Sequence, residues 1–312
     1  MAEARKALVT GGAGFIGSHL VNRLLELGHK VVVADNLSSG RLKNLNTAAT
    51  FSHIDIASPA INDLFDRERP DIIFHHAAQA SVMASFRDPT RDAEVNILGS
   101  LRLMDNALSH GVEKFVFAST GGAIYGDPEY TPCDEEHPIR PLSPYGLSKY
   151  TVERYLEMFH RVSELNYTVL RYANVYGPRQ DPHGEAGVIA IFTKLMLEGE
   201  RPKIYGTGEQ ERDFVYVSDV VEANILALEA SPGSVYNIGT GIGTSVNSIF
   251  NLLKEELGYR WKPDYQPERP GEVFKIALDS TRAREELGWS PRVSLKEGLK
   301  LMLDYYRQAV RP

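Results

Sequence analysis

Short apolar runs alternate with stretches of helical periodicity through the first half of the chain. The apolar runs predict strands near residues 6–10, 30–34, 51–55, 71–76, 114–118 and 167–170. Apolar residues at three- and four-residue spacing predict helices near 18–25, 60–68, 89–109 and 146–163. Such alternation is typical of a doubly wound α/β fold, with a parallel sheet and crossover helices on both faces. We expect ligands to bind at the carboxyl ends of its strands.

The pattern changes beyond about residue 175. A polar loop is expected over 178–187, and the only apolar runs of strand type are short, at 204–205 and 235–238. Helices are predicted near 188–197, 218–230, 245–257, 280–287 and 294–309. We interpret residues 174–312 as a smaller C-terminal α/β domain that closes over the strand ends of a first domain, residues 1–173. Later segments are expected to cross back to the first domain.

Composition and charge narrow the function classes. The chain is 43% hydrophobic and 24% charged, with a net charge of −7 and no basic run, which argues against a nucleic-acid partner. No apolar run approaches the ~20 residues that a membrane-spanning helix needs. The first strand begins within a few residues of the N-terminus, so we expect no signal peptide and a cytoplasmic location. The single cysteine, Cys133, cannot form an internal disulfide, and no Cys/His cluster predicts a metal site.

A glycine-rich segment lies between the first predicted strand and the first predicted helix. It reads Gly11-Gly12-Ala13-Gly14-Phe15-Ile16-Gly17. Glycines at such a turn let backbone N–H groups approach a diphosphate at the positive end of a helix. The second strand ends in Asp35, roughly 20 residues later, where a carboxylate accepts from a ribose hydroxyl and repels a 2′-phosphate. This order predicts a Rossmann-type dinucleotide site that prefers NAD to NADP.

A tyrosine and a lysine stand four residues apart in Ser143-Pro144-Tyr145-Gly146-Leu147-Ser148-Lys149. On a helix, this spacing places both side chains on one face. An ordinary phenol has a pKa near ~10 and is a poor base at neutral pH. A lysine charge close by stabilises the phenolate, and lowering the phenol pKa by ~3 units takes about 4 kcal/mol of differential interaction. The pair is therefore either a contact on a solvated helix face or a phenol tuned to act as a base.

The glycine pattern followed by Tyr-x-x-x-Lys resembles the extended short-chain dehydrogenase/reductase superfamily. Within it, the chain is similar to the UDP-galactose (UDP-glucose) 4-epimerases from residue 6 to about residue 305. The further segments that carry this resemblance are residues 35–40, 76–79, 119–122, 171–179 and 212–215, together with Asn96. Their shared order along the chain favours this family over a chance match.

The resemblance implies NAD as cofactor, a UDP-sugar as substrate and a catalytic set of Tyr145, Lys149 and Thr120. Tyr145 would be the base, Lys149 would bind the nicotinamide ribose and lower the phenol pKa, and Thr120 would bridge the sugar hydroxyl and the phenol. The residues expected to bind NAD are Gly11, Gly14, Phe15, Ile16, Gly17, Asp35, Asn36, Leu37, Ser38, Ser39, Gly40, Asp55, Ile56, Ala77, Ala78, Gln79, Asn96, Ser119, Tyr145, Lys149, Tyr172 and Ala173. The residues expected to bind the UDP-sugar are Thr120, Tyr145, Asn174, Val188, Lys203, Tyr205, Arg212, Arg269 and Glu272.

The chain departs from the family pattern at the bridging hydroxyl. Family members commonly place it four residues before the Tyr-Gly of this loop, a position that is Gly121 here. Thr120 comes one residue earlier, and Ser119 is the neighbouring candidate. We favour Thr120.

The resemblance implies epimerisation at C4 through a transient 4-keto sugar, by a homodimer built from the helices near 89–109 and 146–163. A 4,6-dehydratase usually has Asp-Glu directly after the catalytic threonine, whereas Gly121 and Gly122 follow Thr120. A UDP-uronate 4-epimerase or decarboxylase stays an alternative, because the sequence does not reveal which residues would bind a sugar carboxylate. A non-catalytic NAD-sensing protein would need neither Tyr145 nor Lys149, so the presence of both favours an enzyme. By the resemblance, Ile276 stands at a position that limits the room beside the sugar C2 substituent. Its side chain is of medium size, so the sequence does not decide between sugars with a C2 hydroxyl and sugars with a C2 N-acetyl group.

Overall fold

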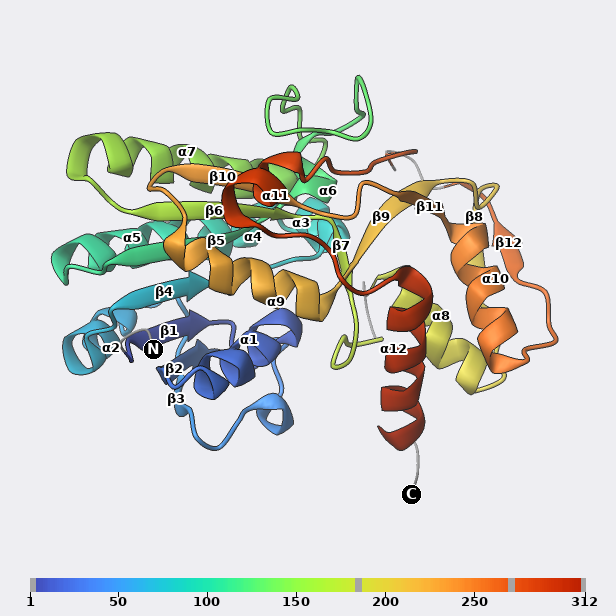
Figure 1. Cartoon of the computed structure of the whole chain (residues 1–312), viewed down its shortest axis with the longest axis horizontal. Coiled ribbons are helices and arrows are strands. Elements are labelled where there is room, and N and C mark those ends of the chain that lie inside the picture. Colours follow the sequence, from blue (N-terminus) through green and yellow to red (C-terminus); the bar gives the residue numbers. More distant parts are fainter. Residues whose placement is uncertain (1–3, 183–186, 269–272, 310–312) are drawn as a thin grey trace.

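A seven-stranded parallel sheet forms the centre of the larger part of the molecule (Figure 1). The computed structural model describes residues 4–182, 187–268 and 273–309. The strands of this sheet are β1 (Lys6–Thr10), β2 (Lys30–Asp35), β3 (Thr50–His53), β4 (Ile72–His75), β5 (Lys114–Thr120), β6 (Tyr167–Tyr172) and β10 (Ser234–Ile238). Their order is β10-β6-β5-β4-β1-β2-β3, and every neighbouring pair is parallel. The Rossmann-type α/β class predicted from the sequence is confirmed.

Helices cover both faces of this sheet. One face packs against α1 (Phe15–Glu26), α9 (Val217–Leu226) and α11 (Thr281–Leu287), and the other against α2 (Ile61–Glu68), α5 (Gly99–Ser109) and α7 (Pro144–Ser163). Successive strand residues point to opposite faces. Ala7 and Val9 therefore join the core under α1, whereas Leu8 joins the core under α2. Both faces of β1 are buried, as is usual in parallel sheets.

The helix expected over 89–109 is divided into three parts. These are α4 (Pro89–Ala93), a π-helical turn η2 (Glu94–Leu98) and α5, and they follow an unexpected short helix, α3 (Val82–Arg87). The side chains of Ser81 and Asp88 cap α3 and α4. A π turn adds a residue to the helical repeat and is often found at functional sites. Here it turns Asn96 into the protein interior.

A smaller group of elements packs beside the sheet around a core of its own. Its strands are β7 (Asn174–Tyr176), β9 (Glu211–Tyr216) and β11 (Gly243–Ser245) in one sheet, and β8 (Lys203–Tyr205) and β12 (Asp264–Gln266) in another. Its helices are α8 (Val188–Leu197), α10 (Val246–Leu257) and α12 (Leu295–Ala309). Phe192, Phe250 and Met302 bring the three helices together. The remaining short elements are η1 (Leu42–Asn44), α6 (Gly121–Ile124) and η3 (Ala227–Glu229).

The strand expected at 235–238 belongs to the large sheet rather than to the smaller group. It is β10, and it pairs with β6 at the sheet edge, with Asn237 opposite Arg171. The chain thus returns to the large sheet after β9, and the division between residues 173 and 174 stays a prediction.

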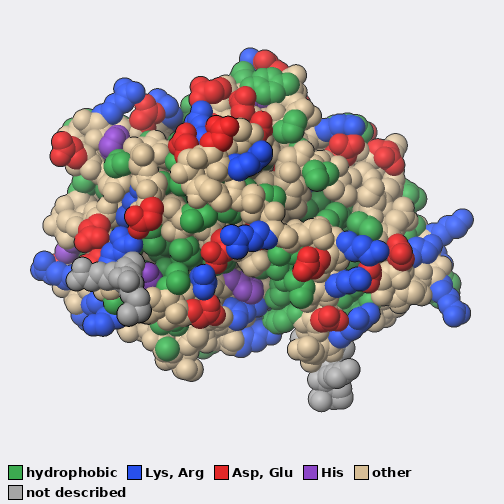
Figure 2. Space-filling model, viewed as in Figure 1, with side chains coloured by type: hydrophobic (Ala, Val, Ile, Leu, Met, Phe, Trp, Pro, Cys, Tyr) green, Lys and Arg blue, Asp and Glu red, His purple; other side chains and the backbone are tan. Residues whose placement is uncertain are grey.

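The exposed surface carries both signs of charge. On the face shown in Figure 2, lysine and arginine side chains are interspersed with aspartate and glutamate side chains. Within the described residues, no helix has the length and apolar character needed to cross a membrane. The described residues also contain no group of three His, Cys, Asp or Glu side chains placed to hold a metal ion.

Candidate active site

The glycine-rich turn joins β1 to α1 at the carboxyl end of the sheet. Gly11 has a φ of +70°, and a Cβ there would lie 2.7 Å from the Ala77 backbone nitrogen. A Cβ at Gly17 would collide with the Gly11 carbonyl oxygen. Gly14 precedes α1 without a side-chain cap for its first turn, which contains Phe15, Ile16 and Gly17. A helix start of this kind fits a diphosphate, because its N–H groups and its positive end are not covered by side chains.

Asp35 joins this turn to the following loop. Its carboxylate accepts from the backbone nitrogens of Ala13 at 2.9 Å and of Leu37 at 2.8 Å. Leu37 is left-handed, with a φ of 57°, and the turn of Ser38, Ser39 and Gly40 folds back over the carboxylate. An ionised carboxylate has about four acceptor positions. Those left free can accept from ribose hydroxyls, so the residues present fit the adenosine half of NAD.

Asp55 and Asn36 form a second polar pair at this edge. The Asn36 amide donates to Asp55 at 3.0 Å, and Arg91 lies 3.3 Å from the same oxygen. Burial alone would raise the pKa of Asp55, but hydrogen bonds from Ala57 and Asn36 and the Arg91 charge lower it below its usual value. Asp55 is therefore ionised at neutral pH. Ile56 beside it is buried.

Asp92, which the sequence analysis did not single out, fixes the loop after β4. Its Oδ1 accepts from Gln79 Nε2 at 2.8 Å and from Asn96 Nδ2 at 3.0 Å. The Asn96 amide also exchanges two 2.9 Å hydrogen bonds with the Gln79 backbone. Asp92 is 1% exposed. The segment that contains Ala77, Ala78 and Gln79 is thus held in one conformation by the π turn and by α4.

Tyr145 and Lys149 lie on the first turns of α7, which begins at the Ser143 cap and Pro144. The Lys149 ammonium is buried and donates to the Ala118 carbonyl at 2.9 Å. It also lies 4.7 Å from the centre of the Phe117 ring. The helix thereby directs Lys149 onto the last residues of β5, beside Thr120.

Ser119 and Thr120 point in different directions. The Ser119 hydroxyl donates to Glu153 at 2.5 Å inside a buried cluster, whereas Thr120 hydrogen-bonds the Tyr145 side chain. Neighbouring residues of a strand face opposite sides of the sheet, which accounts for the difference. The geometry favours Thr120 over Ser119 as the bridging hydroxyl.

The pKa of Tyr145 differs from the expectation. Burial raises it to about 12, a hydrogen bond with Thr120 partly offsets this, and the Asp92 charge adds to the rise. Burial also lowers the pKa of Lys149 to about 8, against the Asp92 and Glu153 charges, which raise it. Lys149 remains mainly charged at neutral pH. Burial is the largest cause of the shift in the Tyr145 pKa in the protein alone, and the expected lowering of this pKa by Lys149 stays a prediction.

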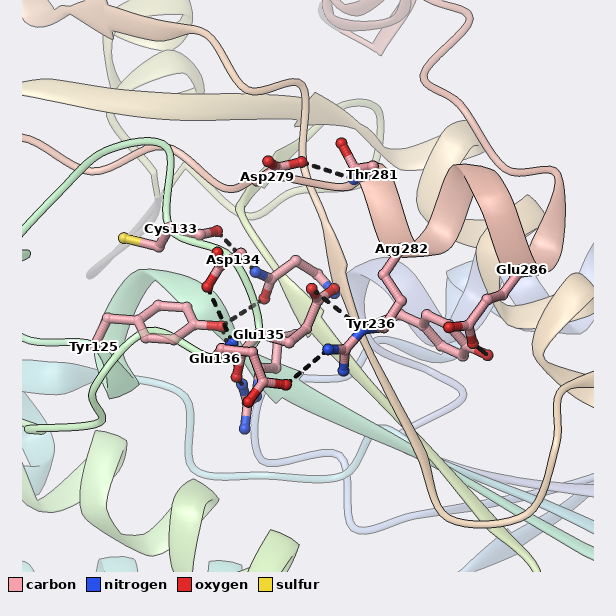
Figure 3. A network of polar contacts seen from close by, with 12 residues as sticks. Tyr125, Cys133, Asp134, Glu135, Glu136, Tyr236, Asp279, Thr281, Arg282 and Glu286 are labelled. Carbon is pink, nitrogen blue, oxygen red and sulfur yellow. Dashed lines mark hydrogen bonds and ion pairs between the residues drawn. The ribbon is translucent and has the colours of Figure 1, made fainter.

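A buried ion pair connects α7 to the strand β6 on which it packs. Arg171 of β6 lies 2.7 Å from Glu153 of α7 and also donates to the Tyr125 hydroxyl at 3.0 Å. Tyr125, which is labelled in Figure 3, in turn donates to Asn237 of β10 at 2.8 Å. Glu153 lacks a recognisable sequence motif, and the only sequence signal was its position one helical turn after Lys149. The pair fixes α7 relative to β5 and β6.

The remaining residues expected around the cofactor and sugar follow β6. The Tyr172 hydroxyl lies 3.1 Å from Asn224 and 3.2 Å from His76, and Ala173 is buried. Asn174 opens β7, and its side chain lies close to Gly122. The sequence order thus brings Asn174 to the same strand ends as Thr120.

The residues expected to bind the nucleotide lie in the smaller group of elements. Arg212 of β9 donates to the Glu211 carbonyl at 2.8 Å, and Tyr205 of β8 is linked to this region by Gln210, which donates to its carbonyl at 3.0 Å. Lys203 is exposed and Val188 is half-buried. Arg269 and Glu272 lie outside the described residues. The roles of all these residues stay predictions.

Comparisons with known proteins agree on one family. The model of the "NAD dependent epimerase/dehydratase family" matches residues 7–239. A UDP-glucose 4-epimerase of Mycolicibacterium smegmatis is 45% identical, over 97% of this chain and 98% of that protein. The crystal structure of the UDP-glucose 4-epimerase of Thermotoga maritima with UDP-glucose has a TM-score of 0.97 at 56% identity, covering 98% and 100% of the two chains. That of the Thermus thermophilus enzyme with NAD has a TM-score of 0.93 at 44% identity, with the same coverage.

Proposed function

The chain belongs to the NAD dependent epimerase/dehydratase family, and from this premise we propose that it is an NAD-dependent 4-epimerase of UDP-glucose and UDP-galactose. The observation that carries the proposal is the contact of Tyr145 on α7 with Thr120 at the end of β5, with Lys149 directed to the same strand end. The relatives that bind UDP-glucose and NAD support the choice of substrate and cofactor.

Tyr145 acts as the base that takes the proton from the sugar C4 hydroxyl. When bound, NAD supplies the hydride acceptor for C4 and, in its oxidised form, a positive charge close to the phenol. Thr120 donates to the phenol and relays its hydrogen bond to the sugar hydroxyl. Because the pKa of Tyr145 is about 12 even with the hydrogen bond from Thr120, the protein also needs nearby positive charge to make a phenolate at neutral pH.

The flat 4-keto sugar must turn over before the hydride returns to its other face. This requires firm contacts to the nucleotide and loose contacts to the sugar. Asn174, Arg212 and Tyr205 hold the UDP group, since an arginine fork suits phosphate oxygens. Val188 and Lys203 border the UDP group. Arg269 and Glu272, which are assigned from the sequence alone, bind it as well.

Elimination of water, the dehydratase reaction of the same family, is disfavoured. It needs an acid/base pair beside the sugar, and Gly121 and Gly122 occupy the positions after Thr120. A UDP-uronate reaction has no supporting contact among the described residues. A purely NAD-sensing protein would leave the burial of Lys149 beside the strand end without a purpose.

We further propose that the enzyme is a cytoplasmic homodimer of galactose metabolism, with the segment from α4 to α5 (residues 89–109) and α7 at the subunit contact. Leu147 and Val162 on α7 are 55% and 74% exposed, as is expected of apolar residues that a second subunit covers.

Incubation with a panel of UDP-sugars and separation of the products tests the function. We expect UDP-glucose and UDP-galactose to interconvert to the same equilibrium mixture from either side. A 4-keto-6-deoxy product would indicate a dehydratase, and a UDP-pentose from UDP-glucuronate would indicate a decarboxylase. Absence of any conversion by protein that contains NAD would contradict catalysis.

A further inference from the structure

We propose that Leu278 determines which residue carries the bridging hydroxyl, by filling the space that any side chain at position 121 would need. The proposal deepens the proposed function and rests on it, because the hydroxyl acts in that reaction. Leu278 is then a positioning residue: it restricts α6, which directly follows β5, so that Thr120 is the hydroxyl presented to Tyr145.

The contrast between two neighbouring glycines carries the inference. A Cβ at Gly121 would lie 2.8 Å from Cδ2 and 3.1 Å from Cγ of Leu278, and closer still to Cδ1. A Cβ at Gly122 would meet nothing nearer than Asn174 Oδ1 at 3.5 Å and Thr120 Oγ1 at 3.9 Å. Position 122 therefore has room for a side chain, whereas position 121 has none while Leu278 keeps its place.

Leu278 is held from both sides by backbone hydrogen bonds. Its own nitrogen donates to Asp213 at 3.2 Å. On one side, Cys133 donates to the Ala277 carbonyl at 2.8 Å, and on the other Asp279 donates to the Cys133 carbonyl at 2.7 Å. The Leu278 side chain is 1% exposed, so it has no solvent-filled space into which it could rotate.

Polar contacts on both sides of Leu278 fasten this segment to the rest of the molecule. Arg282 lies 2.7 Å from Glu136, and Figure 3 shows Arg282 beside Glu135 and Glu136, with Asp279 above Cys133. Asp213, which is 2% exposed, also accepts from the backbone nitrogens of Thr240 and Gly241. These contacts fix the backbone of Leu278, and because its side chain is buried, the clash at position 121 is relieved only if the Leu278 side chain and its neighbours repack.

Two consequences follow for the reaction. A serine or threonine at position 121 is excluded, which leaves Thr120 to bridge the sugar hydroxyl and Tyr145. An acidic side chain at position 121, of the kind that elimination of water would need, is excluded by the same contact. Leu278 thus favours epimerisation over elimination without touching the sugar.

A cycle of variants at positions 120, 121 and 278 tests the proposal, with thermal unfolding, NAD content and epimerase turnover measured for each. Gly121→Ser should lower Tm by about 5 °C or more, because the added side chain overpacks the site. The matched control, Gly122→Ser, should lower it much less. With Leu278→Ala added, the cost of Gly121→Ser should largely disappear.

The activity measurement uses Thr120→Val as background. With Leu278 in place, adding Gly121→Ser to Thr120→Val should not restore turnover. With Leu278→Ala, adding Gly121→Ser should restore it: the triple variant Thr120→Val/Gly121→Ser/Leu278→Ala should be at least tenfold more active than the double variant Thr120→Val/Leu278→Ala. The proposal is overturned if Gly121→Ser restores turnover with Leu278 in place. A folded triple variant that gains no turnover overturns it as well. If the wild-type protein converts no UDP-sugar, the proposed function fails, and the Tm cycle decides separately whether Leu278 excludes a side chain at 121.

Discussion

Tyr145 carries the proposed chemistry, and its surroundings show what the other site residues must supply. Its position at the start of α7 and the four-residue spacing to Lys149 were predictable from the sequence, because one helix fixes both. The pKa was not predictable. It depends on desolvation, which packing from several elements produces, and on the charge of Asp92, which comes from a different helix.

Replacing Tyr145 by phenylalanine keeps the ring and removes the ionisable oxygen. We expect normal folding and NAD content, with turnover lower by at least ~100-fold, the scale of general acid-base catalysis. Steady-state kinetics and the dinucleotide released on denaturation check this. Turnover near that of the wild type would show that another group is the base.

The two candidate hydroxyls give a matched pair of variants. Thr120→Val preserves shape and removes the hydrogen bond to Tyr145, so turnover should fall between about 5- and 150-fold, corresponding to ~1–3 kcal/mol. Ser119→Ala should reduce turnover much less, because its hydroxyl faces Glu153 rather than Tyr145. The reverse ranking of the two variants in kcat would mean that Ser119 is the bridging residue.

At the scale of elements, α7 is positioned by long-range contacts that no local pattern reveals. The sequence predicts a helix near 146–163 from its apolar spacing, and β5 and β6 from their apolar runs. The partner of Glu153, however, is Arg171, 18 residues away on a strand. The π turn, and the place of β10 in the large sheet, were missed for a similar reason, since tertiary packing decides them.

Glu153→Gln removes one partner of a buried ion pair and leaves the Arg171 charge without its counter-ion. We expect a loss of about 3–5 kcal/mol in the free energy of unfolding. Glu157→Gln, on the same helix but facing Arg154 and Arg161 at the surface, should cost at most ~1 kcal/mol. Urea unfolding of both variants checks the difference, and equal losses would show that the Glu153–Arg171 pair does not position α7.

At the scale of the whole molecule, the alternation of strands and helices was sufficient to predict the parallel sheet, whereas the edge where ligands bind stays a prediction. The smaller group of elements was less predictable. Strands β7, β11 and β12 have three residues each, too few for an apolar pattern to emerge. Its relation to the large sheet depends on contacts such as those of Asp213, which join segments far apart in the chain.

The pH dependence of stability follows from two buried histidines at the end of β4. Burial, and then the Lys149 charge, lowers the pKa of His76 to about 3 and that of His75 well below its usual value. Below pH 6.5 the unfolded chain binds protons at these residues and the folded protein does not. The free energy of unfolding should therefore fall as the pH drops from 6.5 to 5, by up to about 1.4 kcal/mol per pH unit for each histidine.

Urea midpoints measured between pH 5 and 8 test this dependence. His76→Gln should reduce the slope below pH 6.5, whereas the same substitution at the exposed His53 should leave it unchanged. A slope that His76→Gln does not alter would mean that His76 is protonated in the folded protein.

The most direct test of the central claim follows the hydrogen at sugar C4. If the hydrogen removed from C4 returns to C4 as hydride, UDP-glucose labelled with deuterium at C4 should give UDP-galactose that retains the deuterium in ordinary water. Mass spectrometry and NMR of the separated product measure this retention, with Tyr145→Phe as the inactive control. We predict full retention at C4. Loss of the label to solvent, or release of a product without the C4 hydrogen, would contradict epimerisation through a transient 4-keto sugar.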